Sequence, residues 1–206
     1  MEQIDALVIG AGVVGLAVGF GAQSLVKDYF TGIVLLIENQ IRAGDIIEVG
    51  GKSGTVENMT LRYVRLRDAE GNVHFVPNGQ INSVTNSTME FAYAMIDVGI
   101  AYKEDIDASI QVMQKVGTEL AEDQEWRSKI TEPMSTFGVQ QLADSAVVIR
   151  VRFKTLPGEQ WAVRREYNKR IKAAFDNVGI EIPFPHVTMC PSGGSAVELP
   201  AQISSS

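Results

Sequence analysis

Small and apolar side chains dominate the first forty residues of the chain. No side chain from 6 to 22 is charged, and a second uncharged run covers 29–37. Seventeen residues of helix span about 26 Å at 1.5 Å per residue, close to the roughly 30 Å of bilayer hydrocarbon. The pattern predicts a membrane-spanning helix within residues 1–40. Glu2 and Asp5 precede the run where a secretory signal would carry basic residues, so we do not interpret it as a signal peptide.

The pattern changes at Ile41. Short apolar runs alternate with turn residues, and between 53 and 68 apolar side chains recur at about every second position, which is typical of strands. Turn signals stand at 70–72 and 77–79. We therefore predict about five short strands in residues 41–87, forming a small β barrel or sandwich within a domain of residues 41–90.

A third pattern covers residues 91–187. It predicts strand 93–101, helix 104–121, strands 134–142 and 145–154, helix 159–178 and strand 180–184. This β-α-β-β-α-β order is typical of a ferredoxin-like α/β sandwich. Gly179 follows the second helix, as a C-terminal glycine should. Residues 188–206 are rich in Gly, Ser and Pro and are predicted to be a flexible tail.

Within the first apolar run, Gly10-Ala11-Gly12-Val13-Val14-Gly15 matches the dinucleotide-binding fingerprint G-x-G-x-x-G. In that reading the glycines would hold a pyrophosphate and Glu38, 23 residues past Gly15, would hold a ribose. The segment 16–22 has no polar side, however, and 23–42 reads as continued helix. A flavin- or NAD-dependent oxidoreductase is therefore kept as an alternative function.

The same glycines fit a helix that other helices approach closely. Gly12, Gly15 and Gly19 keep the helix surface small, as in membrane helix packing. Leu16 and Phe20 are four residues apart and share one face. In a ring of such helices they would form stacked apolar constrictions, which gate by dewetting. The alternative is that both side chains face lipid or a neighbouring helix.

Composition and charge narrow the function further. The formal net charge is −7, which argues against nucleic-acid binding, so the basic residues of 164–172 read as a solvated or intersubunit face. Cys190 is the one cysteine, and His74 and His186 lie far apart, so no metal site is expected. No catalytic set emerges, and we expect neither an enzyme nor a bound cofactor. His74 is interpreted as a strand residue beside a turn.

Several motifs in a fixed order resemble the small-conductance mechanosensitive channel (MscS) family. They are 15-GLAVGFGAQ-23, 42-RAGD-45, 54-GTV-56, 76-VPNGQI-81, 83-SVTNST-88, 96-IDVGIAYKEDID-107 and 180-IEIPFP-185. The resemblance covers most of the chain, and the combination is far more specific than a lone G-x-G-x-x-G.

The resemblance implies roles for residues of the first helix. Leu16 and Phe20 fall at the pore constriction, where family members often have leucine at both positions. Helix packing is implied for Gly12, Gly15, Ala17 and Gly19, and bending of the helix for Gln23, Ser24 and Gly32. After the first bend, the helix would continue along the membrane surface as an amphipathic segment, with Leu25, Tyr29 and Ile33 on one face.

The resemblance also implies an assembly and an activity. A membrane helix, an Sm-like β domain and an α/β cytoplasmic cage domain would build a ring-shaped homo-oligomer, expected to be a heptamer. In the bacterial inner membrane, with its C-terminal domains in the cytoplasm, this channel would release ions and small osmolytes on membrane tension. Lipid would be its other partner. The family's earlier, tension-sensing helices are not in this sequence, so a fragment or a reduced form is expected. A ring scaffold that does not conduct is the second alternative.

Overall fold

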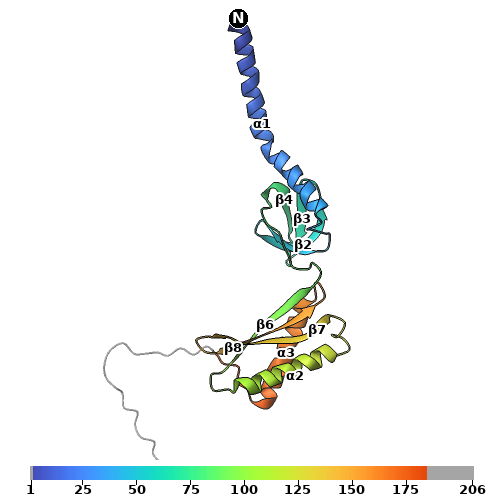
Figure 1. Cartoon of the computed structure of the whole chain (residues 1–206), viewed down its shortest axis with the longest axis vertical. Helices are drawn as coiled ribbons and strands as arrows, with labels where there is room; N and C mark the ends of the chain where they lie inside the picture. Colours follow the sequence, from blue (N-terminus) through green and yellow to red (C-terminus); the bar gives the residue numbers. More distant parts are fainter. Residues whose placement is uncertain (1, 185–206) are drawn as a thin grey trace, which may run out of the picture.

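A computed structural model describes the backbone of residues 2–184 and the side chains of residues 19–184. Three parts follow one another along the longest axis of the molecule (Figure 1). A long helix stands at one end, a small β domain lies in the middle, and an α/β unit lies at the other end.

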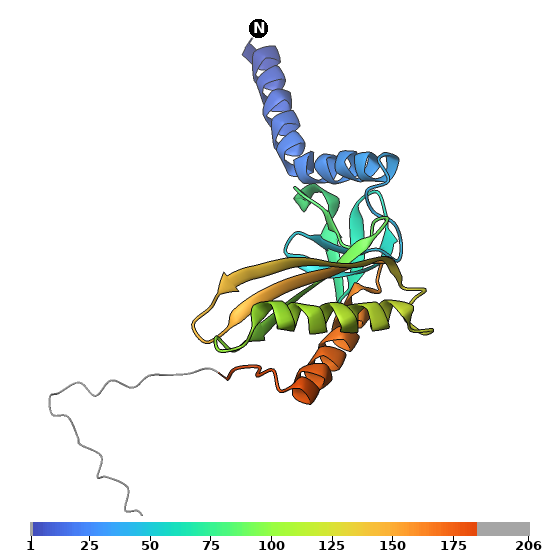
Figure 2. The ribbon, with the colours of Figure 1, turned by 60° about the horizontal axis from the view of Figure 1, so that its bottom comes forward.

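The first part is the helix α1, Glu2–Ile37. Figure 2 shows it as two straight stretches that meet at a sharp bend, the second lying across the β domain. Residues 10–15 are helical, whereas a dinucleotide fingerprint needs a strand and a glycine turn before its helix. The phosphate-loop interpretation of Gly10, Gly12 and Gly15 is therefore wrong. Among the residues whose side chains are described, one stretch, Gly19–Ile37, has the length and apolar composition to cross a membrane.

The β domain contains the five short strands expected from the sequence. They are β1 Ile46–Val49, β2 Lys52–Met59, β3 Tyr63–Arg67, β4 Val73–Pro77 and β5 Thr85–Asn86. The sheet has the order β4-β3-β2-β1-β5 with antiparallel neighbours. Its buried side chains include Ile47, Val56 and Leu66, and Leu35 from the end of α1 joins the same cluster. Burial of a leucine stabilises by about 1.5–3 kcal/mol, so this contact ties the helix to the domain.

The turn between β3 and β4 is held by Asp68. Its carboxylate accepts hydrogen bonds from the backbone N–H groups of Glu70 (3.0 Å) and Asn72 (2.8 Å) and from the Asn72 side-chain amide (3.0 Å). The His74 ring lies 2.9 Å away. The Asn72 side chain, followed by His74, holds the pKa of Asp68 well below its usual range. His74 is thus a strand residue beside a turn, as predicted.

The α/β unit is built from β6 Ala92–Ile100, α2 Ile106–Glu122, β7 Ile130–Leu142, β8 Val147–Thr155 and α3 Gln160–Val178. Its antiparallel sheet has the order β6-β8-β7. Both helices lie against one face of this sheet (Figure 2). Strict alternation of buried and less buried residues along β6 and β8 sends every second side chain into the core. Large core residues include Ile96, Met113, Ile149, Phe153, Tyr167 and Phe175.

Local signals set the helix ends in this unit. The Asp105 side chain accepts a hydrogen bond from Ala108 N (2.9 Å) as the N-cap of α2. Gly179 ends α3 with a positive φ of 76°, a conformation that glycine adopts without a steric penalty.

The strand predicted at 180–184 is not formed. A backbone hydrogen bond from Ala101 N to Glu181 O (3.0 Å) joins this segment to the end of β6, but the segment is not a strand. Pro183 lacks the N–H that a ladder would need. The predicted tail, 188–206, lies outside the described residues.

Part of the basic face of α3 is paired with neighbouring carboxylates. Arg170 bonds Glu166 and Asp123, both at 2.8 Å, and so links α3 to the end of α2. Lys172 pairs with Asp176 at 2.5 Å. These ion pairs offset part of the positive charge of 164–172, and the interpretation as a solvated or intersubunit face stays a prediction.

Candidate functional site

The second stretch of α1 is joined to the β domain through Asp28. This carboxylate is 7% exposed although it belongs to a helix whose neighbouring side chains are mostly apolar and exposed. Its Oδ1 accepts a hydrogen bond from Gly79 N (2.8 Å), and Arg62 Nε lies 4.0 Å from its Oδ2. A buried carboxylate is stable only where such donors meet it, so the helix has a defined seat.

The Pro77-Asn78-Gly79 turn forms that seat. It continues into the short 3₁₀ helix η1, Asn78–Gln80, in which Asn78 is fully buried. The Asn78 side-chain amide donates to Thr60 O (3.0 Å), and its backbone N–H donates to Arg62 O (2.9 Å). A Cβ at Gly79 would lie 2.6 Å from Asp28 Oδ1. Only glycine therefore lets the helix come this close.

Gly32 is the matching close approach on the helix side. A Cβ there would overlap the Leu61 carbonyl oxygen and the Asn78 side-chain amide, and would lie 2.7 Å from the Leu61 carbonyl carbon. Gly32, one turn beyond Asp28, is also buried. Together with Leu35, these two residues place one side of the second stretch of α1 against the β domain.

Two replacements of Asp28 separate the loss of its oxygen acceptor from the loss of its charge. We expect Asp28→Ala to lower the free energy of unfolding by about 1–3 kcal/mol, because Gly79 N–H loses its acceptor in a buried place. Asp28→Asn keeps an oxygen acceptor and is expected to lose less than half as much. Denaturant unfolding of both variants measures this. Equal losses would contradict the assignment of the Gly79 bond as the main contribution.

The residues predicted for the pore lie on the other stretch and near the bend. Phe20 is 74% exposed, and nothing lies within 4 Å of a Cβ built at Gly19. Gln23 and Ser24 are exposed as well. The remaining predicted residues are in α1, but their side chains lie outside the described residues: Gly12, Gly15, Leu16 and Ala17. In a single chain Phe20 thus has its apolar surface available for other helices, lipid or a pore.

Sequence reasoning did not identify Asp28, Asn78 and Gly79 as a connected set. A signal was present, since Asp28 is the one carboxylate between residues 6 and 37. Its partner is 51 positions away, a separation that local patterns do not reveal. The P-N-G motif was recognised only as a turn and a family motif.

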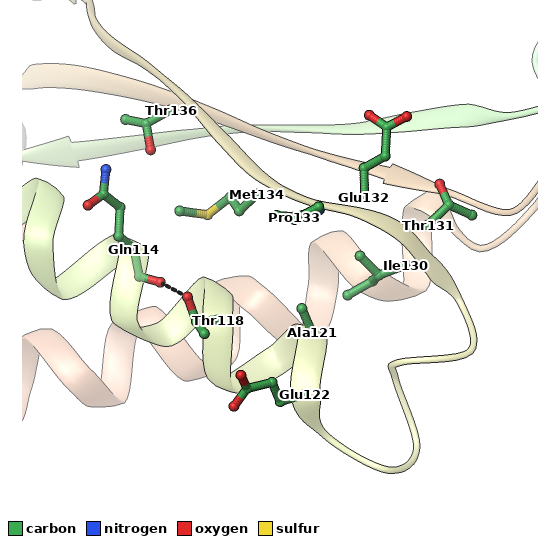
Figure 3. Close-up of a pocket in the computed structure, with 10 residues that line it drawn as sticks. All are labelled: Gln114, Thr118, Ala121, Glu122, Ile130, Thr131, Glu132, Pro133, Met134 and Thr136. Atoms are coloured by element: carbon green, nitrogen blue, oxygen red, sulfur yellow. Dashed lines mark hydrogen bonds between the residues drawn. The ribbon is translucent and has the colours of Figure 1, made fainter.

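A hollow lies between α2 and β7 (Figure 3). Its titratable residues are Glu122 and Glu132, and Lys154 pairs with Glu132 at 2.5 Å. Thr118 Oγ1 donates to Gln114 O (3.0 Å), within the helix itself. Within residues 19–184, no group of three or more His, Cys, Asp or Glu could hold a metal ion.

Comparison with known proteins accounts for this arrangement. The family model "Mechanosensitive ion channel, beta-domain" matches residues 24–89, and "Mechanosensitive ion channel MscS, C-terminal" matches residues 94–182. The chain belongs to the MscS family. The first match begins just before Asp28 and includes the P-N-G turn, so the seat of the helix lies wholly within it.

Two similar proteins are named as mechanosensitive channels. A small-conductance mechanosensitive channel of Caldanaerobacter subterraneus subsp. tengcongensis is 36% identical over 91% of this chain and 65% of its own length. The moderate conductance mechanosensitive channel YbiO of Escherichia coli is 34% identical over 94% of this chain and 26% of its own length. The chain therefore spans less than two thirds of these two relatives.

Solved MscS structures share the fold. Helicobacter pylori MscS in its closed state superposes with a TM-score of 0.76 at 27% identity, covering 93% of this chain and 75% of that chain. Arabidopsis thaliana MSL1, with a TM-score of 0.65 at 17% identity over 89% of this chain and 67% of that chain, supports the fold alone. The two relatives above are named as channels, and none of these matches supports the oxidoreductase alternative.

Proposed function

We propose that this chain is a subunit, or a large part of one, of a mechanosensitive channel that releases ions and small osmolytes on membrane tension. The single observation that carries the proposal is the division of α1. Its second stretch is fixed to the β domain at Asp28 and Gly32, whereas Phe20, which comes earlier in the same helix, is left exposed. A helix held at one end and uncovered at the other is suited to lining a ring.

The first stretch of α1 would be the pore lining. Leu16 and Phe20 would form the apolar constriction, one turn apart on the same face. Small side chains would let neighbouring helices pack closely around it, namely Gly12, Gly15, Ala17 and Gly19. Gln23 and Ser24 would permit the bend, and Gly32 would permit a second bend in addition to its packing against Leu61. The amphipathic second stretch would lie at the membrane surface.

The rest of the chain would complete the assembly. The whole chain would then consist of a helical part (1–40), an Sm-like β domain (41–90), a ferredoxin-like cage domain (91–187) and a tail (188–206). Seven copies would form a ring in the bacterial inner membrane, with the cage in the cytoplasm. The β-α-β-β-α order and the three antiparallel strands support the ferredoxin-like description of the cage domain.

The proposal is tested by native mass and current in the same preparation. The detergent-purified chain should have the mass of about seven subunits without cofactor. After its reconstitution into bilayers, conductance should rise with applied tension. A monomer or dimer would contradict the ring. A ring that stays out of membranes and carries no current would favour the scaffold alternative.

A further inference from the structure

Within residues 19–184, no helix covers one face of the α/β sheet, which we call the uncovered face. Helices α2 and α3 lie against the other face (Figure 2). On the central strand β8, Arg150, Arg152 and Lys154 alternate with fully or largely buried side chains and therefore point to the uncovered face. Three basic side chains at alternate positions of one strand form a positive row in a chain that has 25 acidic and 18 basic residues.

Aromatic rings contact two of these cations, Arg152 and Lys154. The Arg152 guanidinium carbon lies 4.3 Å from the centre of the Tyr93 ring and 4.9 Å from that of Phe137. Lys154 Nζ lies 4.7 Å from the centre of the Phe91 ring, which itself packs edge-on against Tyr93 at 5.3 Å. Strands β6, β7 and β8 thus hold the Arg152 side chain in one orientation before any partner arrives.

Arg152 differs from its neighbours because it lacks a carboxylate. Arg150 makes a bidentate pair with Asp97 at 2.6 and 2.7 Å, and Lys154 pairs with Glu132. Within residues 19–184, Arg152 has no ion pair, and its Nε is buried without a hydrogen-bond partner. Partial burial of a guanidinium is unfavourable in free energy unless an anion pairs with it. A carboxylate from another chain would therefore stabilise Arg152.

The composition of the face is that of a protein interface. Tyr93 and Met95 are each 37% exposed, and Phe137 is 54% exposed. Tyrosine, phenylalanine, methionine and arginine are the residue types enriched in the centres of interfaces.

A complementary surface is present on the same chain, at the end of α2. Glu119 and Glu122 lie in its last turn, where there is no basic residue. The negative end of a helix dipole disfavours carboxylates there, and in the described part of the chain neither side chain makes an ion pair. Since α2 lies on the opposite side of the sheet (Figure 2), these carboxylates do not reach Arg152 of their own copy.

We propose that the uncovered sheet face packs on the acidic end of α2 of a second copy, with Arg152 paired to Glu119 and Glu122 across the contact. The two surfaces differ, so the contact is head-to-tail, and repeated contacts of this kind close into a ring. The inference rests on the proposed ring and adds which surfaces build it in the cage domain.

Charge exchange in the full chain tests the contact. Arg152→Glu and Glu122→Arg should each raise, at least tenfold, the concentration at which half of the subunits are assembled, measured by native mass on dilution. The double variant should return it to within threefold of the parent. Lys103→Glu, a charge reversal at an exposed side chain between β6 and α2, should leave it unchanged. Two single variants without effect, or a double variant without rescue, would overturn the contact while leaving the ring intact as a proposal.

A labelling measurement guards against misfolded variants. In a Cys190→Ser background with otherwise native surfaces, Met95→Cys should react with a thiol reagent at least tenfold more slowly than Lys103→Cys, at an exposed position, while the chain is assembled. Equal rates in an assembled ring would overturn the proposal. So would fast labelling of Met95→Cys after removal of residues 185–206 from a persisting ring, since the tail would then be the cover. A chain that is monomeric throughout would refute both this contact and the ring.

Discussion

Gly32→Ala is expected to displace the second stretch of α1 from the β domain. The added methyl group would overlap the Leu61 carbonyl oxygen and the buried Asn78 side chain, and backbone does not yield as a flexible side chain does. Overpacking of this kind costs about 1–3 kcal/mol or more. Because Asp28 lies one turn earlier, its bond to Gly79 should weaken at the same time.

Hydrogen exchange at the amides of Asn78–Gln80 measures the displacement. We expect the Gly79 amide to exchange at least tenfold faster in Gly32→Ala, and the tension needed for opening to change in the reconstituted protein. Gly21→Ala is the matched control, because nothing lies within 4 Å of a Cβ at that position. It should be neutral or stabilise the helix by about 0.5–1 kcal/mol. Unaltered exchange in Gly32→Ala would show that this contact does not hold the helix.

Phe20→Asn is expected to make the channel leak without applied tension. If Phe20 forms the constriction, its ring excludes water from the closed pore, and an amide would admit it. The change removes about 1.5–3 kcal/mol of apolar transfer free energy per subunit. Since about 1.4 kcal/mol corresponds to a factor of ten, conductance at rest should rise at least tenfold.

Currents in planar bilayers at zero tension provide the measurement, with growth of expressing cells as a second readout. Phe30→Asn is the matched control, since Phe30 is similarly exposed, at 68%, but lies on the stretch that is fixed to the β domain. It should not leak. If Phe20→Asn conducts no more than the parent at rest, Phe20 faces lipid or a neighbouring helix instead.

Local patterns were sufficient for most of the secondary structure. The strands expected at 93–101 and 145–154 and the glycine at 179 each depend on residues close in sequence, and each is found within two residues of its expected place. The exception at 180–184 is also local in origin. The apolar residues of 180–184 suggested a strand. A strand needs a neighbouring strand and backbone N–H groups that can bond to it, and Pro183 has no N–H.

The sequence by itself determined the order of a long apolar helix, a five-stranded domain and an α/β unit, because hydrophobic periodicity reports which face of each element is buried. It left the G-x-G-x-x-G segment open to two readings, since the same glycines suit a phosphate loop and a close-packed helix. The tertiary structure decided that question, because 10–15 are helical within α1. It also decided where Asp28 is bound and that Arg152 lacks a carboxylate. Both depend on residues distant in sequence that meet only when the sheets and helices pack, and no local pattern encodes such a meeting.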